Sequence, residues 1–534
     1  MNKVPSQPGN RIAGTFCVIV LLFVVAFYGV AYRIGRGQLA VPADTHRAQP
    51  YTPSFYVEAF ARVPTSSSHV PQARGVVVNH HLLAPNFIAR ALATVASTEA
   101  RTVVLISPNH FGRGQGRLTT TNQNWDTPFG LLPANASVIH ALVHSQKVVL
   151  DPYPFNGEHG VTGMVAFIKH ALPQATIVPI LVKDTASNAE ISELVAKFAR
   201  VLPANTLVVG SFDFAHYVPS DLAQFQDVLA SAALSGDLAV IERLNIDSQP
   251  GLQLFLRTLY AFHAPRFVQL DHTNSGDLTH SPNATDVTSY FTGYFMSGEQ
   301  KAIARATVYV LGDVVFTGAT RAALIQDAYT YFDASFHRTV SGSDVLLAGS
   351  TSSTAADQTR LAQLDVQVVQ SNNQEVRMFP YDIRGAQIRV VQGNAATSLP
   401  TFTSTIANAK APDIAVIATV RWPQSITNVQ PAQQRYARAL IDAGADLVVG
   451  YSPVPLGQES YQGKAIYYSL GTAVDIPGHT TASVGLGVTV EKNRMAVQTF
   501  GFRQHKGMPR PLGQAERDIL LLKVGISPFT QIPL

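Results

Sequence analysis

The chain has 534 residues, too many for one hydrophobic core, so we expect two or three domains. Hydrophobic residues make up 46% of it and charged residues only 14%, which excludes long disordered tracts. The net charge of +4 is small for this length and no dense block of Lys and Arg is present, so nucleic acid is not expected as a partner.

The N-terminal segment is apolar. Residues 12–32 form a run of 21 residues without a charge, bracketed by Arg11 and Arg33. Such a helix would span the roughly 30 Å hydrocarbon core of a bilayer, so we expect an uncleaved transmembrane helix behind a cytoplasmic tail at 1–11. The protein is then expected to be a single-pass membrane protein whose bulk lies outside the cytoplasm. The one cysteine, Cys17, lies in this segment, so disulfides and thiolate metal sites are excluded elsewhere.

Residues 33–73 are rich in Pro, Ser, Thr and Ala and are expected to form a linker. From Arg74 onward, apolar β-branched runs alternate with stretches at helical spacing, which predicts an α/β domain with a parallel sheet at 74–297. The expected strands are 75–79, 102–107, 175–182, 206–210 and 285–295, and the expected helices are 86–98, 189–202, 221–232, 237–244 and one opening at Glu158-His159.

Histidines follow three of these strands: His80, His110 and His216. Ligands of open α/β sheets bind at the carboxyl ends of the strands, so we expect these side chains to meet in one site. Neutral imidazole is the commonest metal ligand and suits iron, copper and zinc. The alternative for each histidine is a hydrogen-bonded structural role. His81 directly follows His80, and in a continuing strand only one of the two can face the site.

Polar neighbours of these histidines allow two interpretations each. Glu158 and His159 open a helix, where Glu158 either belongs to the site or complements the helix dipole. Asp213 and His216 form either a general-base pair or anchors that orient other groups. Asn109 either donates a hydrogen bond to a bound oxygen or serves as a turn residue.

The ordered motifs between residues 74 and 297 are Asn79-His-His-Leu-Leu-Ala84, Ser107-Pro-Asn-His-Phe-Gly112, Trp125-Asp-Thr-Pro-Phe-Gly130, Glu158-His159, Ser211-Phe-Asp-Phe-Ala-His216 and Ser289-Tyr290. This series resembles the Memo family, which in bacteria is the AmmeMemoRadiSam system protein B group. That family is similar to the class III, LigB-type extradiol dioxygenases, which bind non-haem iron.

The resemblance implies a metal held by His80, His110 and a third ligand, which an ungapped count from Ser289-Tyr290 places at His280. The implied cofactor is one transition metal, iron first, with copper or zinc as alternatives. The resemblance further implies catalytic residues that move or orient protons, namely His159, His216, Asp213 and Glu158, and substrate-binding residues, namely Asn109 and His81. Asn79 stands where the family usually has proline, and the cysteine of the animal protein is missing, so the identity of the metal stays open.

A second series of strands and helices begins at Arg305 and predicts a layered α/β domain at 305–503. A C-terminal tail at 504–534 follows, with a short apolar helix expected near Ile519–Val524. The expected elements are strands at 307–318, 414–420, 446–450 and 465–471 and a helix at 433–443.

Leu311-Gly-Asp313, 442–450 and Tyr467-Tyr-Ser-Leu-Gly471 resemble the CapA type, a calcineurin-like metallophosphatase fold named for poly-γ-glutamate capsule synthesis. Where that family has Gly-His-His-Pro-His, this chain has Gly450-Tyr-Ser-Pro-Val454, and where it has His-Trp-Gly, this chain has Arg421-Trp-Pro423. A two-metal centre needs several imidazoles and carboxylates. We therefore expect this half to have lost its metals and to be catalytically inactive.

These patterns together predict a membrane-anchored α/β protein with a Memo-like and LigB-like first domain and a degenerate CapA-like second domain. If the first domain is an enzyme, its resemblance implies metal-dependent, dioxygenase-like or redox chemistry on a small molecule. The alternative is a non-catalytic module that binds a peptide or an envelope polymer on the same folds, because a fold does not determine a function.

Overall fold

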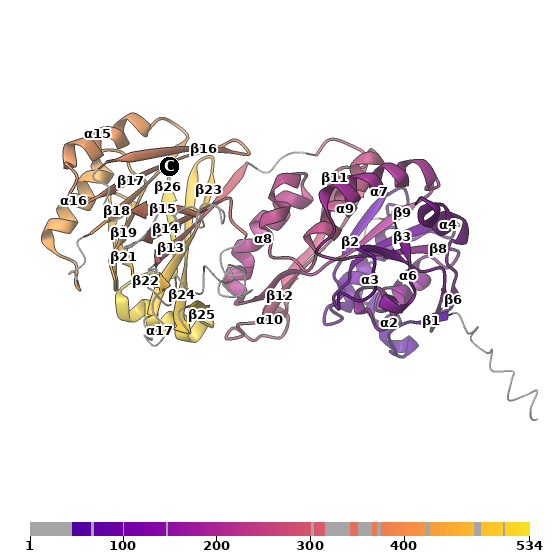
Figure 1. The fold of residues 1–534 in the computed structure, drawn as a ribbon. Coiled ribbons are helices and arrows are strands. Elements are labelled where there is room, and N and C mark those ends of the chain that lie inside the picture. Colours follow the sequence, from indigo (N-terminus) through magenta and orange to yellow (C-terminus); the bar gives the residue numbers. More distant parts are fainter. Residues whose placement is uncertain are drawn as a thin grey trace, which may run out of the picture.

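The computed structural model describes residues 45–65, 69–99, 101–145, 148–300, 304–314, 342–350, 366–370, 375–422, 427–474, 482–505 and 508–534. Two lobes are visible in Figure 1, one coloured indigo to magenta and one orange to yellow. Both contain helices and strands, and the protein has a mixed α/β fold with several sheets.

A nine-stranded sheet forms the centre of the first half. Its strands are β10 (Phe214–Val218), β12 (Val287–Met296), β2 (Gly75–Val78), β9 (Leu207–Ser211), β3 (Thr102–Pro108), β8 (Thr176–Val182), β4 (Leu118–Thr120) and β7 (Val149–Leu150) in spatial order, with β11 (Arg266–Asn274) paired to β12. The four strands β2, β9, β3 and β8 run parallel, and they are the strands predicted from their apolar runs. Each is buried along nearly its whole length, as expected for a parallel sheet covered on both faces.

Helices cover both faces of this sheet. One face packs on α2 (Pro53–Ala61), α3 (Pro85–Thr94) and α6 (Val165–Ala171), and the other on α4 (Ala136–His144), α7 (Asn188–Val201), α8 (Ser220–Leu234) and α9 (Gln249–Ala261). The short elements are η1 (Tyr153–Phe155), α5 (His159–Thr162), η2 (Leu238–Arg243) and α10 (Ser275–Leu278), and a small separate sheet contains β1 (Thr45–Arg47), β5 (Asn124–Thr127) and β6 (Gly130–Leu132).

The second half contains two sheets that pack against each other. One contains β15 (Val366–Gln370), β14 (Val345–Ser350), β13 (Arg305–Val314), β23 (Ala482–Glu491), β24 (Arg494–His505) and β25 (Met508–Pro511), with β22 (Thr472–Val474) and β26 (Phe529–Pro533) attached. The other contains β16 (Arg377–Ile383), β17 (Ala386–Asn394), β18 (Ile414–Arg421), β19 (Leu447–Tyr451), β21 (Lys464–Leu470) and β20 (Pro455–Tyr461). Side chains of both sheets share one core, and α15 (Leu399–Ala409) and α16 (Pro431–Asp442) cover the outer face of the second sheet.

The predicted membrane anchor is not supported and is corrected here. Its residues, 12–32, lie outside the described part of the chain, and no helix within the described ranges is long and apolar enough to cross a membrane. The longest helix among them, α8, has 15 residues. At a rise of about 1.5 Å per residue it falls short of the roughly 30 Å hydrocarbon core. The predictions of a single-pass membrane protein and of an extracytoplasmic bulk are withdrawn with it.

Helices and strands also occur in the two segments that flank the expected domains, and the short helix expected near 519–524 lies within α17 (Gln514–Val524). The expected linker at 33–73 contains β1 and α2, and α2 places Tyr56 in the core of the first half. The expected tail at 504–534 contributes β25 and β26 to a sheet and forms α17 between them. The boundaries 74–297 and 305–503 remain proposals, and these additions extend both units.

Candidate metal centre

The site lies where β2, β9 and β3 end at the same edge of the sheet. These three strands are neighbours in the order β2, β9, β3, and each is followed by polar residues of the predicted site. His80 follows β2, Asp213 follows β9, and His110 follows β3. His159 is the first residue of α5, which packs against β3.

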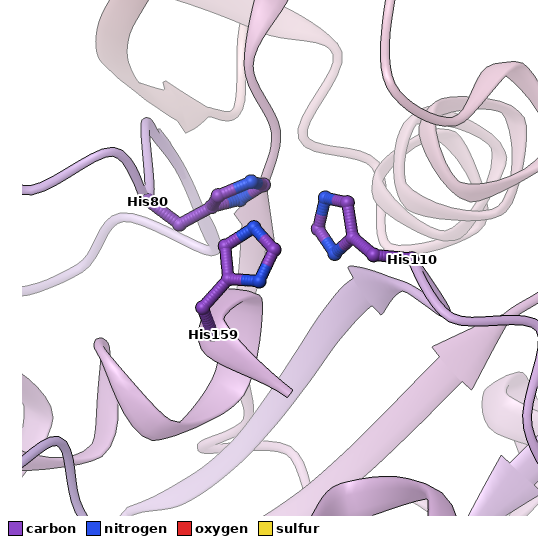
Figure 2. Close-up of side chains that lie close together, drawn as sticks. All are labelled: His80, His110 and His159. Carbon is purple, nitrogen blue, oxygen red and sulfur yellow. The ribbon is translucent and has the colours of Figure 1, made fainter. Parts of the chain in front are cut away.

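The imidazoles of His80, His110 and His159 point toward one another (Figure 2), and one ligand atom of each lies within 4.8 Å of the others. The ring centroids of His80 lie 4.9 Å from His110 and 5.0 Å from His159, and those of His110 and His159 are 4.0 Å apart. Within the described ranges this is the one group of three such side chains whose ligand atoms lie this close. It could hold a metal ion.

Hydrogen bonds fix which nitrogen of His80 faces the pocket. The hydroxyl of Ser211 donates to the carbonyl of Gly160 at 2.8 Å, so its oxygen is left to accept from Nδ1 of His80 at 3.2 Å. Nδ1 therefore carries the proton and Nε2 presents a lone pair to the pocket. Burial, and next the imidazoles of His110 and His159, hold the pKa of His80 well below its ordinary value, so the ring is neutral.

Glu158 does the same for His110. This carboxylate is fully buried and accepts from Nδ1 of His110 at 2.6 Å and from its backbone N–H at 3.0 Å. Nε2 of His110 is then the free nitrogen, as is usual for a histidine ligand held by a carboxylate. Glu158 also accepts from the N–H of Gly160 as the N-cap of α5, so it contacts both a clustered histidine and the start of this helix.

Asp247 is a member of this pocket that the sequence analysis missed. Its Oδ2 lies 3.3 Å from Nε2 of His80 and 3.9 Å from Nε2 of His110, and its side chain is only 4% exposed. Oδ2 also accepts from the backbone N–H of Asp213 at 2.8 Å, whereas Oδ1 is buried without a partner. In the sequence, Asp247 directly precedes Ser248, the N-cap of α9. Acids are common at this position, so no sequence signal distinguishes Asp247 from an ordinary helix-start acid.

Two buried carboxylates therefore lie beside His80. Nε2 of His80 is 3.6 Å from Oδ2 of Asp213, whose Oδ1 accepts from the backbone N–H of His80 at 3.0 Å. Burial raises the pKa of Asp213, and burial together with the charge of Asp213 raises the pKa of Asp247 well above its ordinary range. Oδ2 of Asp247 lies beside two bare imidazole nitrogens, and the other oxygen of the same carboxylate, Oδ1, is buried without a partner. Two imidazoles and a carboxylate are a donor set that fits a divalent transition metal.

His280, the predicted third ligand, does not join this group. It lies in an exposed turn after α10 with a φ of 52°, and its N–H donates to the carbonyl of Asp277. The ungapped count that selected it ignored how β11 and β12 fold back on each other across this turn. In the described chain, His159 is the third imidazole and Asp247 the additional acid.

The other predicted residues lie near the pocket with partners of their own. Both amide atoms of Asn109 bond to the backbone of Arg113, so its role in the structure is that of a turn residue. His81 contacts the hydroxyl of Tyr290 through Nδ1 at 2.5 Å. His216 contacts the carbonyl of Asp213 through Nε2 at 3.1 Å, and its charge acts on both His80 and Asp213.

In the second half, Arg421 fills the place of the expected metal motif. Its guanidinium donates two hydrogen bonds to the carboxylate of Asp313, one from Nη1 to Oδ2 at 2.8 Å and one from Nη2 to Oδ1. Both side chains are buried, with exposures of 3% and 0%. Burial raises the pKa of Asp313, and Arg421 opposes that rise. The one carboxylate that matched the metal motif is thus paired within the protein.

The site and the sheet around it define a Memo-type α/β domain. Residues 54–293 match the family described as Memo-like protein, and residues 328–475 match the family described as bacterial capsule synthesis protein PGA_cap. A MEMO1 family protein of Methanopyrus kandleri is 30% identical over 209 residues, which are 37% of this chain and 73% of that protein. The chain belongs to the MEMO1 family, and a PGA_cap domain follows its Memo-like part.

Other relatives match over shorter lengths. A MEMO1 family protein of Nitrosopumilus maritimus is 26% identical over 137 residues, or 25% of this chain and 49% of that protein. Among solved structures, Vps29 of Chaetomium thermophilum aligns with 38% of this chain and 93% of its own at 10% identity and a TM-score of 0.23. Vps29 of Entamoeba histolytica, crystallised with zinc, gives 12% identity and a TM-score of 0.22 over 38% of this chain and 96% of its own. Similarities this weak carry no argument about this chain.

Proposed function

We propose that the Memo-like half binds one transition metal, with iron first, and supports metal-dependent oxygen or redox chemistry on a small substrate. The observation that carries this proposal is the approach of the buried carboxylate of Asp247 to Nε2 of His80 and Nε2 of His110, at 3.3 and 3.9 Å. Two histidines and one carboxylate with open positions are the ligand set of non-haem iron(II) oxygenases. A bound divalent metal would supply Lewis-acid and redox chemistry there.

The residues of the chain divide the remaining work. Glu158 and Ser211 hold the rings of His110 and His80 with their bare nitrogens inward. The side chain of Asp213 accepts from the backbone N–H of His80 and so holds the end of β2. The backbone N–H of Asp213 donates to the carboxylate of Asp247. These contacts position the ligands and support the rigidity that a metal site requires.

His159, the most exposed of the three clustered imidazoles, exchanges protons with a substrate in this proposal and is not one of the three metal ligands. Its side chain is 41% exposed, whereas the side chain of His80 is 2% exposed. The centroid of its ring lies 4.0 Å from that of His110 and 6.2 Å from that of the half-exposed Phe111. Burial, followed by the charge of His110, lowers its pKa, so the neutral form that accepts a proton is favoured.

The test uses nitric oxide as a probe that needs no knowledge of the substrate. The full chain is loaded with iron(II) without oxygen, treated with nitric oxide and examined by electron paramagnetic resonance. We expect the half-integer-spin signal of nitric oxide bound to a non-haem iron that keeps an open position. Bound iron without that signal would contradict oxygen chemistry and favour the non-catalytic binding module.

A further inference from the structure

We propose that the second half of the chain acts as a built-in buttress that positions Asp213 and Asp247 in the pocket of the first half. This inference rests on the proposed metal site and concerns how its affinity is set. The buttress acts on β10, the strand that directly follows Asp213, and on α8, the helix that directly follows β10.

The backbone of β10 is held in a conformation that ordinary residues avoid. Ala215 has a φ of 27° and Tyr217 a φ of 57°, and neither is glycine. The pairing of β10 with β12 shifts register on both sides of His216, because five residues of β10 face three of β12. Such conformations are unfavourable for residues other than glycine and persist only where the surroundings impose them.

Side chains of the second half provide those surroundings. Ala215 and Val218 of β10 belong to a buried apolar cluster that both halves build. Its members from the first half also include Leu222, Ala223, Phe225 and Val287, and its members from the second half are Tyr309, Leu311, Val314, Leu346, Ala348, Ala473, Phe500 and Phe502. Ala215 and Val218 of the strained strand are therefore packed against side chains of the second half, whereas the side chain of Tyr217 is exposed.

Contacts along α8 join the same two parts. The ring of Phe225 lies 5.7 Å from Tyr309 and 5.8 Å from Phe500, which are themselves stacked 5.8 Å apart. At the start of α8, Asp221 forms an ion pair with Arg517 of α17. In Figure 1, α8 lies on the side of the first lobe that faces the second.

The strained strand connects directly to the metal pocket. Asp213 precedes β10 by one residue, donates its backbone N–H to Asp247 and accepts the N–H of His80. The N–H of Ala215 donates to the carbonyl of Asn245, two residues before Asp247, at 2.7 Å. A shift of β10 would therefore move both carboxylates relative to the imidazoles, and the contacts of Phe225 and Arg517 oppose that shift.

The experiment titrates cobalt(II) into the full-length protein and follows its visible absorption, whose bands report the ligand geometry. The interface variants are Phe225→Ala, with Phe225→Leu as a milder form, and Arg517→Ala. The matched controls are the same types of substitution at positions within the second half. Phe402→Ala removes a buried ring, and Arg438→Ala removes an ion pair with Glu459. Far-ultraviolet circular dichroism confirms folding of each variant.

We expect the interface variants to bind cobalt about tenfold more weakly with altered bands, as removal of supporting contacts typically does, while the controls keep the wild-type spectrum and affinity. Folded interface variants with wild-type spectra and affinities would overturn the buttress while leaving the metal site intact. A wild-type protein that binds no cobalt would instead overturn the metal site and the buttress with it. Equal weakening in the controls would reduce the effect to general destabilisation and would also overturn the proposal.

Discussion

The imidazoles of His80 and His110 are oriented by side chains that lie far from them in the sequence. Glu158 lies 48 residues from His110, and Ser211 lies 131 residues from His80, yet each fixes the proton on Nδ1. Because the fold and not local sequence brings these groups together, the ligand geometry depends on residues that do not touch the proposed metal. That dependence gives a prediction for Glu158.

Glu158→Gln should weaken metal binding by about 10–100-fold without abolishing it, because the amide can still meet the ring of His110 but lacks the charge that raises its basicity. Isothermal titration of the full chain with zinc measures the change. Glu190→Gln is a suitable control, since Glu190 caps α7 away from the pocket and its change should leave zinc affinity unaltered. Equal affinities of the Glu158 variant and the wild type would show that this carboxylate does not support a ligand.

At the scale of elements, the apolar runs predicted the strands well, whereas residues whose position depends on a turn were predicted poorly. The runs that became β2, β3, β8 and β9 are buried and β-branched, and the parallel sheet with its carboxyl-end site follows from them. Helix 86–98 was predicted too long, since α3 ends at Thr94. The position of His280 could not be counted along the sequence, and Asp247 could not be found there, because both depend on turns that only the folded sheet defines.

The start of α5 packs closely against β3, and this contact gives a further prediction. A Cβ at Gly160 would collide with the Oγ of Ser107 and would lie 3.5 Å from Cε1 of His110. Gly160→Ala should therefore lower the free energy of unfolding by about 1–3 kcal/mol, the usual cost of overpacking, and displace His159. Chemical denaturation measures the loss, and the double variant with Ser107→Ala should recover most of it. A single variant as stable as the wild type would mean that α5 can shift freely.

At the scale of the whole molecule, the two halves differ in how a buried carboxyl group is paired. The first half leaves Oδ1 of Asp247 without a partner, whereas the second half closes Asp313 with Arg421. A buried charge that loses its partner typically costs 3–5 kcal/mol. Asp313 and Arg421 therefore stabilise the second half only when both are present. Because Arg421 bonds to both oxygens of Asp313, this carboxylate has no free position for a metal.

We accordingly predict that the full chain with excess manganese does not hydrolyse a generic phosphate ester, because two metals cannot be held where a guanidinium occupies the carboxylate. In the same chain, Arg421→Ala should lower the free energy of unfolding by about 3–5 kcal/mol, and adding Asp313→Ala should restore part of it. Phosphatase turnover that disappears with Asp313→Ala would contradict this assignment.

The most direct test of the metal pocket is the metal content of the full-length protein, measured by elemental mass spectrometry after purification and exposure to iron, copper and zinc in turn. We expect about one equivalent of one of these metals in the wild type. We expect little or none in His110→Ala and in Asp247→Ala, and an unchanged metal content in His280→Ala. Full metal content in His110→Ala, or loss of the metal in His280→Ala alone, would contradict the proposed metal site.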